Sequence, residues 1–177
     1  LDLSKIEAGE IELHLEDIDI VTMIDSVEKT VGPLMQKNAN KFSAEYSDDI
    51  GVMHADLTRV RQVLFNILSN AVKFTPENGT IRMSAQRQDG NVVLTTSDSG
   101  IGISAEDQER VFEKFERGSS AEARRSGAGL GLSLVKSFIE LHGGTVELQS
   151  AADVGTKVIC TLPARAGSVT VSHPASA

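Results

Sequence analysis

Residues 58–76 read TRVRQVLFNILSNAVKFTP and are the most strongly patterned stretch of the chain. At about 100° per residue, the apolar positions of a helix over 58–74 share one face: Val60, Leu64, Ile67 and Ala71. Thr75-Pro76 ends this helix, because proline cannot continue it. Three polar residues fall together on nearly the opposite face: Asn66, Asn70 and Lys73. The spacing therefore predicts an amphipathic helix with two amides and an ammonium group on its second face.

The polar face of this helix suits a phosphate-bearing ligand. Carboxamide oxygens are hard ligands that suit Mg²⁺, and a lysine ammonium meets phosphate oxygens as a point charge. A solvated helix face has the same composition and is the commoner origin of such a stripe. Two further motifs bear on the choice between these interpretations.

The first motif is a glycine loop, Asp98-Ser99-Gly100-Ile101-Gly102, which follows a strand with alternating Val92, Leu94 and Thr96. An acidic side chain at a strand end can accept a hydrogen bond from a base amino group. Bare glycines let a planar ring approach the backbone closely. An ordinary glycine turn is the alternative interpretation.

The second motif, Gly127-Ala-Gly129-Leu-Gly131, precedes an apolar helix whose N-terminal amides and dipole suit a phosphate. It is not the dinucleotide fingerprint GxGxxG, because Leu132 stands where the third glycine belongs. It is not a Walker loop either, since no GK[ST] follows it. Flexible packing glycines are the alternative, but the three motifs in this order are more specific than any one of them.

The remaining pattern predicts an α/β domain built from strands and helices. Expected strands cover 11–15, 42–46, 80–86, 91–97, 145–150 and 156–162, and expected helices cover 1–8, 21–37, 104–115 and 130–142. Asp19 or Thr22 is expected to cap the helix at 21–37, and Ser104 opens the next one as a capping box. Residues 117–131 are predicted to form a mobile loop.

Composition narrows the class of protein. The 177 residues carry 17 basic and 25 acidic side chains, and the net charge of −8 argues against a nucleic-acid binder dominated by phosphate neutralisation. The single cysteine, Cys160, excludes an internal disulfide and a cysteine-based structural metal site, which favours a cytoplasmic setting. No apolar run has the roughly 18 residues needed to cross a bilayer. Because the chain begins at Leu1, we expect a fragment of a longer protein, which is either soluble or anchored in the inner membrane through a segment outside this chain.

Five segments resemble, in order, the N, G1, F, G2 and G3 boxes of sensor histidine kinase catalytic domains: FNILSNAVKFTP, DSGIGI, FEKF, GAGLGLSLVK and VGT. This ATP-binding domain belongs with gyrase, Hsp90 and MutL to the Bergerat-fold superfamily. The resemblance therefore implies a two-layer α/β sandwich, with a mixed, mostly antiparallel sheet of about five strands and three helices on one face. The G2 region is particularly similar to alphaproteobacterial members, including the DivL type. The resemblance implies the end of a dimerisation helix and a linker at 1–9, the ATP-binding domain at 10–164 and a flexible tail at 165–177.

The resemblance implies that ATP and Mg²⁺ bind here, with the adenine held by the G1 and G3 boxes. Asp98 would accept the adenine amino hydrogen, while Gly100 and Gly102 let the base lie close to the backbone. Thr156 would lie near the adenine pocket. The nucleotide is expected between the helices and a lid formed by the mobile loop.

On the phosphate side, the resemblance assigns Mg²⁺ coordination to Asn70 and the lining of the phosphate site to Asn66. Lys73 would contact phosphate, and Arg117 would approach the γ-phosphate. Phe112 and Phe115 of the F box would anchor the lid. The hinges and backbone amides of the G2 box are expected from Gly127, Gly129, Leu130 and Gly131.

Asn66 bears on the reaction. In ATP-hydrolysing members of the superfamily, a glutamate at the first N-box position activates water as a general base. An amide cannot take a proton at neutral pH, so efficient hydrolysis is disfavoured and phosphoryl transfer to an external acceptor remains. We therefore expect a protein histidine kinase catalytic domain rather than an efficient ATPase.

The acceptor is expected outside this chain. None of the four histidines, His14, His54, His142 and His173, stands in an H-E-x-x-x-P-like context. His142 is expected to be a helix C-terminal residue favoured by the helix dipole. The expected partners are the dimerisation and histidine phosphotransfer domain of the same protein and a response regulator. The alternative is a pseudokinase or scaffold that senses ATP or binds a partner without phosphorylating histidine.

Overall fold

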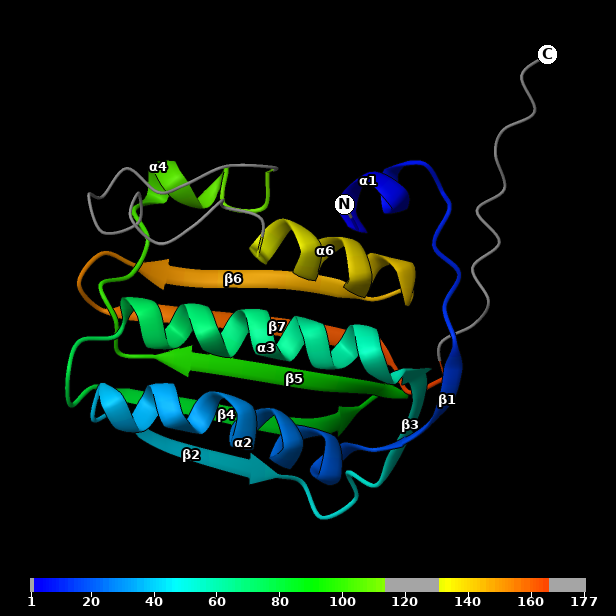
Figure 1. Cartoon of the computed structure of the whole chain (residues 1–177), viewed down its shortest axis with the longest axis horizontal. Helices are drawn as coiled ribbons and strands as arrows, with labels where there is room; N and C mark the ends of the chain where they lie inside the picture. Colours follow the sequence, from blue (N-terminus) through cyan, green and yellow to red (C-terminus); the bar gives the residue numbers. More distant parts are fainter. Residues whose placement is uncertain (1, 114–130, 166–177) are drawn as a thin grey trace.

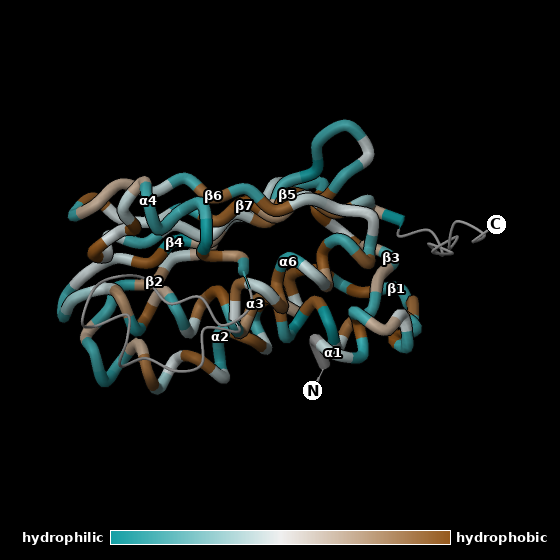
Figure 2. Tube along the Cα trace, turned by 90° about the horizontal axis from the view of Figure 1, so that it is seen from above, coloured by the Kyte–Doolittle hydropathy of each residue, from teal (hydrophilic) through white to brown (hydrophobic). Residues whose placement is uncertain are grey.

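The computed structural model of the chain describes residues 2–113 and 131–165. A five-stranded sheet has the order β2-β4-β5-β7-β6, with β2 and β4 parallel and the other neighbours antiparallel. Its strands are β2 (Lys41–Tyr46), β4 (Thr80–Gln88), β5 (Asn91–Asp98), β6 (Thr145–Ala151) and β7 (Gly155–Pro163). The helices α2 (Ile20–Lys37), α3 (Leu57–Phe74) and α6 (Gly131–Leu141) cover one face of it (Figure 1). Figure 2 shows the two layers from above, so the predicted two-layer sandwich is confirmed.

The core lies between these layers. The apolar face predicted for α3 is buried: Val60, Leu64, Ile67 and Ala71. On the sheet, the inward positions alternate as expected for a face that packs against helices: Val92 and Leu94 on β5, and Val158, Cys160 and Leu162 on β7. No helix among the described residues is both long and apolar enough to cross a membrane.

A second sheet pairs β1 (Leu15–Asp19) with β3 (Val52–Asp56) in antiparallel register. β3 was not predicted, and the strand expected at 11–15 is wrong in position. The pairing runs from Leu15 opposite Asp56 to Asp19 opposite Val52. Because β3 is only five residues long and leads directly into α3, residues 11–14 have no opposing strand.

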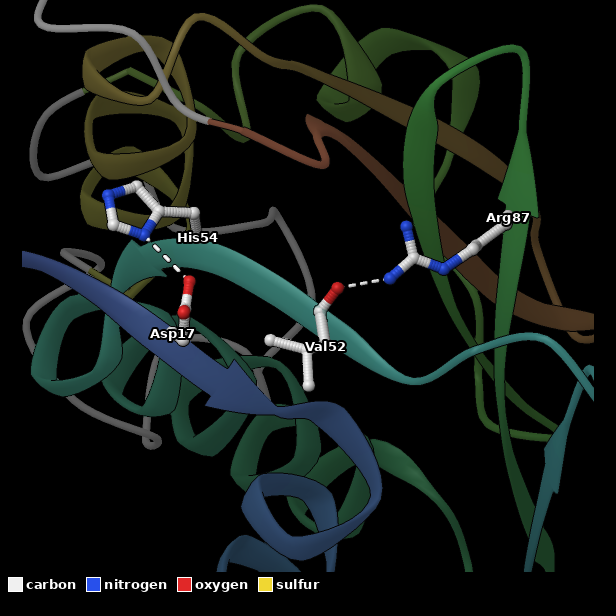
Figure 3. A network of polar contacts seen from close by, with 4 residues as sticks. All are labelled: Asp17, Val52, His54 and Arg87. Carbon is white, nitrogen blue, oxygen red and sulfur yellow. Dashed lines mark hydrogen bonds and ion pairs between the residues drawn. The ribbon is translucent and has the colours of Figure 1, made fainter.

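Polar contacts hold this small sheet together and join it to the large one (Figure 3). Within the small sheet, Asp17 Oδ1 lies 3.0 Å from Nδ1 of His54, its partner across the strands. Arg87 of β4 donates from its guanidinium to the Val52 carbonyl and from Nε to the Ile50 carbonyl at 2.8 Å. The start of β3 is therefore attached to the main sheet by one long side chain.

Aspartates define the starts of the two long helices. Asp19 accepts a 2.9 Å hydrogen bond from the Thr22 backbone N–H, which identifies Asp19 as the cap of α2 and lowers the pKa of its carboxyl group. Asp56 accepts a 3.1 Å bond from the Arg59 N–H and caps α3 in the same way. The helix at the chain start, α1 (Asp2–Glu7), is followed by Gly9 with φ +69°, which fits the predicted stop.

The helix predicted over 104–115 is much shorter. Ser104 is its cap and accepts a 3.2 Å bond from the Asp107 N–H, but α4 covers only Ala105–Gln108. None of its residues is buried. A helix without an apolar face against the core gains little from packing, and turns follow α4 up to residue 113.

Candidate nucleotide-binding site

The polar residues predicted on α3 lie outside the core. Asn66 and Asn70 are half-buried and Lys73 is exposed, whereas the apolar positions between them are buried. The two amides stand one turn apart on the same helix side, which α6 approaches at its N-terminus. The predicted separation of polar and apolar faces on α3 is thus confirmed.

Gly131, the first residue of α6, lies directly against Asn70. A Cβ atom built on Gly131 would be 3.2 Å from Asn70 Nδ2. The first turn of a helix carries backbone N–H groups without intrahelical partners and the positive end of the helix dipole. The fold therefore brings an amide side chain from α3 beside a helix start suited to an anion, although 61 residues separate them in sequence.

Asp98, the last residue of β5, lies directly opposite Thr156 of β7. Its Oδ1 accepts a 2.8 Å hydrogen bond from the Gly100 N–H. Burial raises the pKa of this carboxyl group, and hydrogen bonds from the Gly100 and Thr156 backbones act in the opposite direction without cancelling the rise. A half-buried carboxylate with remaining lone pairs is an acceptor for a ligand N–H group.

The loop after Asp98 packs against the end of α3. The Ile101 N–H donates to the Phe74 carbonyl at 3.1 Å. A Cβ on Gly100 would be 2.6 Å from that same carbonyl oxygen and 2.7 Å from Asp98 Oδ1. Glycine at 100 is therefore required for the loop to lie this close to both groups, and the contact joins the G1 loop to the N-box helix.

Two further glycines fit the loop to the hairpin between β6 and β7. Gly102 has φ +67°, and a Cβ there would be 1.9 Å from the Ala151 carbonyl oxygen. Gly155 has φ +134°, and a Cβ there would be 2.0 Å from the Asp98 carbonyl oxygen. At both positions the positive φ favours glycine, and a backbone oxygen of another residue occupies the space that a Cβ atom would need. The predicted adenine-side residues are thus brought together.

Ser150 and Gln108 join this group although the sequence analysis missed both. Ser150 Oγ lies 2.9 Å from Thr156 Oγ1, and Gln108 Nε2 donates to the Ile103 and Ser150 carbonyls at 2.7 and 2.8 Å. The sequence did contain a signal for Ser150. Every second residue of β6 faces the helices, as Val146 and Leu148 do, and Ser150 places a hydroxyl group at the next position of this apolar series.

His142 corrects one expectation. It follows α6 as predicted, but its ring is buried, with the Nδ1–H donating to the Phe138 carbonyl at 2.7 Å and Nε2 accepting from the Asp56 N–H at 3.1 Å. Burial lowers the pKa of His142, against weaker upward effects of the Phe138 bond and the Asp56 charge. The ring therefore contributes hydrogen bonds rather than a solvent-exposed charge at the end of α6, and these bonds tie α6 to the start of α3.

Several predicted residues lie outside the described residues: Phe115, Arg117, Gly127, Gly129 and Leu130. Phe112 is described; it is half-buried in the turns that follow α4. In the described part of the chain, no group of three or more histidine, cysteine, aspartate or glutamate side chains is arranged to hold a metal. A cleft of about 520 Å³ lies at the other end of α3 and contains none of the predicted residues; it is lined by Leu13, His14, Leu15, Glu16, Asp56, Thr58 and Arg59.

Known proteins are similar to this chain in sequence and fold. The chain is 35% identical to the sensor protein DivL of Caulobacter vibrioides over 163 residues, which cover 92% of this chain and 20% of DivL. The chain thus spans about a fifth of the length of this curated relative. The structure of full-length ShkA in complex with AMPPNP matches with a TM-score of 0.81 and 30% identity, over 91% of this chain and 33% of ShkA.

A third similar protein has a structure determined together with a partner protein. Histidine kinase ThkA, in complex with the response regulator protein TrrA, matches with a TM-score of 0.73 and 25% identity, over 91% of this chain and 46% of that chain. Residues 55–166 match the family described as histidine kinase-, DNA gyrase B-, and HSP90-like ATPase. This match contains the N, G1, F, G2 and G3 segments. The chain therefore belongs to that ATPase family, as a catalytic domain of the histidine kinase type.

Proposed function

We propose that this chain binds Mg²⁺-ATP and presents the γ-phosphoryl group to a histidine on a dimerisation domain of the same protein. The observation that carries the proposal is the placement of the Asp98 acceptor at one end of a site whose other end is formed by Asn70 and the start of α6. A nucleotide needs both: an acceptor for its base and an anion site for its phosphates.

The adenine half rests on the ends of β5 and β7. The Asp98 carboxylate accepts the adenine amino group, and the close approach of Gly100 to its neighbours keeps side chains out of the base plane. Gly102 and Thr156 complete this half. Because Asp98 is half-buried, its hydrogen bond to the base forms away from competing water.

The phosphate half rests on α3 and α6. The Gly131 backbone supports phosphate at the helix start, while Asn66 lines the site and Lys73 reaches phosphate oxygens from the exposed side of α3. The Asn70 amide oxygen fits Mg²⁺, which in nucleotide sites takes few protein ligands beside phosphates and water. When bound, the ion neutralises phosphate charge; Asn70 orients it.

At the first N-box position this chain has an amide, Asn66, instead of a glutamate base. Asn66 cannot accept a proton at neutral pH, so transfer to an external acceptor is favoured over hydrolysis. Among the described histidines, His142 is buried and bonded through both ring nitrogens, and His54 contacts Asp17 in the small sheet. We therefore place the acceptor histidine on another domain, and a response regulator downstream of it.

The roles predicted outside the described residues remain part of the proposal. Arg117 approaches the γ-phosphate, Phe115 anchors the lid with Phe112, and the G2 box contributes hinges and amides through Gly127, Gly129 and Leu130. The ShkA complex with AMPPNP and the ThkA complex with TrrA support nucleotide and response-regulator binding by related proteins.

Binding of Mg²⁺-AMPPNP to the 177-residue chain tests the adenine half. In Asp98→Asn, Oδ1 can still accept from the Gly100 N–H, but an amide donor then faces the adenine amino donor. We expect about hundredfold weaker AMPPNP binding, with a smaller loss for an inosine analogue, whose base has an oxygen at that position. Asp89→Asn, in the turn at the opposite end of β5, is the matched control. No saturable binding by the unmodified chain would refute the proposal.

Phosphoryl transfer is tested on the full-length parent with [γ-³²P]ATP. An acid-labile phosphohistidine supports the kinase, and this label should disappear with Asp98→Asn. Nucleotide binding without any label in the parent protein would instead support a scaffold that senses ATP.

A further inference from the structure

The Ser150 hydroxyl group joins three backbone segments at the adenine end of the site. Its Oγ accepts a 2.8 Å hydrogen bond from the Ile103 N–H, donates to the Gly155 carbonyl at 2.8 Å and lies 2.9 Å from Thr156 Oγ1. Ile103 belongs to the segment that follows the G1 loop, and Gly155 starts β7. The Ser150 side chain therefore connects its own strand, β6, to the start of β7 and to the segment after the G1 loop.

The strand registers place Ser150 in line with the proposed base acceptor. Ser150 pairs with Thr156, and Thr156 pairs with Asp98. Residues directly opposite one another in neighbouring strands point to the same face of a sheet. The three side chains form one polar row across β6, β7 and β5, on the face that the helices cover.

The number of hydroxyl hydrogens in this row determines which hydroxyl group donates and which accepts. A serine hydroxyl has one hydrogen and two lone pairs. The Gly155 carbonyl can only accept, so it takes the hydrogen, and the Ile103 N–H occupies one lone pair. Thr156 must then donate to the remaining lone pair of Ser150. The Thr156 hydroxyl is left with acceptor capacity only, as is the Asp98 carboxylate beside it.

Gln108 extends the same connection to α4. Its Nε2 donates to the Ile103 carbonyl at 2.7 Å and to the Ser150 carbonyl at 2.8 Å. Ile103 is thus held through its N–H by Ser150 and through its carbonyl by Gln108. Both backbone polar groups of Ile103, which lies between the G1 loop and α4, are therefore fixed by these two side chains.

We propose that Ser150 and Gln108 are positioning residues for adenine recognition: they hold the G1 segment against β7 and orient the Thr156 hydroxyl as an acceptor beside Asp98. The proposal deepens the proposed function and rests on it. Neither residue is assigned to contact the nucleotide. Their contribution comes from fixing the acceptors before the base arrives, which reduces the ordering cost of binding.

The test compares four variants of the 177-residue chain by calorimetric titration with Mg²⁺-AMPPNP. Ser150→Ala removes the hydroxyl, Ser150→Thr keeps it, and Gln108→Glu replaces the donor with an acceptor that faces two carbonyls. Ser43→Ala removes a hydroxyl group from an exposed position of β2, away from the site. We expect about tenfold weaker binding for Ser150→Ala and Gln108→Glu, and binding within threefold of the unmodified chain for Ser150→Thr and Ser43→Ala.

A second readout separates positioning from a general loss of structure. The guanine base of GMPPNP has an oxygen where adenine has its amino group. GMPPNP binding therefore gains little when the Thr156 and Asp98 acceptors are ordered. Ser150→Ala should therefore reduce the preference for AMPPNP over GMPPNP about tenfold. An equal loss for both nucleotides, or failure of Ser150→Thr to restore binding, would overturn the proposal. If Ser150→Ala does not fold, Gln108→Glu decides by the same criteria.

The two proposals fail in different ways. If the unmodified chain binds AMPPNP and Ser150→Ala and Gln108→Glu bind it equally well, the positioning role is wrong and the proposed function stands. If the unmodified chain binds no AMPPNP, the proposed function is wrong and the positioning role fails with it.

Discussion

Replacing His142 tests how the two site-bearing helices are held together. The His142 side chain is 1% exposed, and its ring joins the Phe138 carbonyl on α6 to the Asp56 N–H at the start of α3. Asp56 in turn caps α3 through the Arg59 N–H. His142→Ala leaves a buried N–H without its acceptor and opens a cavity, so we expect the free energy of unfolding to fall by about 3 kcal/mol.

The same group predicts a dependence on pH. Because burial lowers the pKa of His142, the unfolded chain binds its proton more readily than the folded chain. The stabilisation is therefore complete above the ordinary histidine pKa of about 6.5 and is lost as the pH falls toward the folded value. One group of this kind contributes a slope of at most about 1.4 kcal/mol per pH unit.

Urea unfolding between pH 5.5 and 7.5 measures both effects, with His142→Gln as the informative variant. Glutamine can still accept from the Asp56 N–H but does not titrate, so part of the stability remains and the His142 slope disappears. His14→Ala, at an exposed histidine, is the control and should keep the slope. The reasoning is refuted if His142→Ala loses less than about 1 kcal/mol, or if His142→Gln retains the full slope of the unmodified chain below pH 6.5.

Two further predictions concern backbone fit and a buried thiol. Gly102→Ala places a Cβ 1.9 Å from the Ala151 carbonyl oxygen, so it should destabilise the fold by about 2 kcal/mol more than Gly90→Ala, where φ is +78° but no atom lies within 4 Å. Thermal unfolding measures the difference, and equal losses would contradict the predicted clash. Burial raises the pKa of Cys160 to about 12, so iodoacetamide at pH 8 should label this thiol only after unfolding. Rapid labelling of the folded chain would show that the thiol is accessible.

Local sequence signals predicted the elements that carry strong periodicity and clear ends. α3 combines a long apolar period with Thr75-Pro76 behind it, and its predicted end at Phe74 agrees with the structure. The same holds for α6, which begins at Gly131 and is followed by the turn at Gly143. Short elements behaved differently. In β3, the exposed Val52 alternates with buried Met53, so hydrophobicity alone gave no usable contrast.

The residues that sequence reasoning missed act across long distances in the chain. Ser150 meets Ile103 across 47 residues, and Asp56 meets His142 across 86. The strand period of 2 residues and the helix period of 3.6 residues cannot predict such long-range contacts, because the contacts depend on the order of the strands and the packing of the helices. The sequence motifs and the family resemblance supplied Asn70 and Asp98 as candidate site residues, but the contacts around them could be found only in the fold.

The proposed nucleotide site rests on two structural supports of different kinds. Its phosphate half is carried by α3 and α6, which run in opposite directions, so that Asn70 meets Gly131 at one end while Asp56 meets His142 at the other (Figure 1). Its adenine half is carried by strand ends, where the backbone ladder fixes the polar row. The two halves meet where the Ile101 N–H donates to the carbonyl at the end of α3. Under the proposed function, a nucleotide that spans both halves depends on helix packing for its phosphates and on sheet register for its base. Residues remote from the ligand, such as His142 and Ser150, therefore bear on the proposed chemistry.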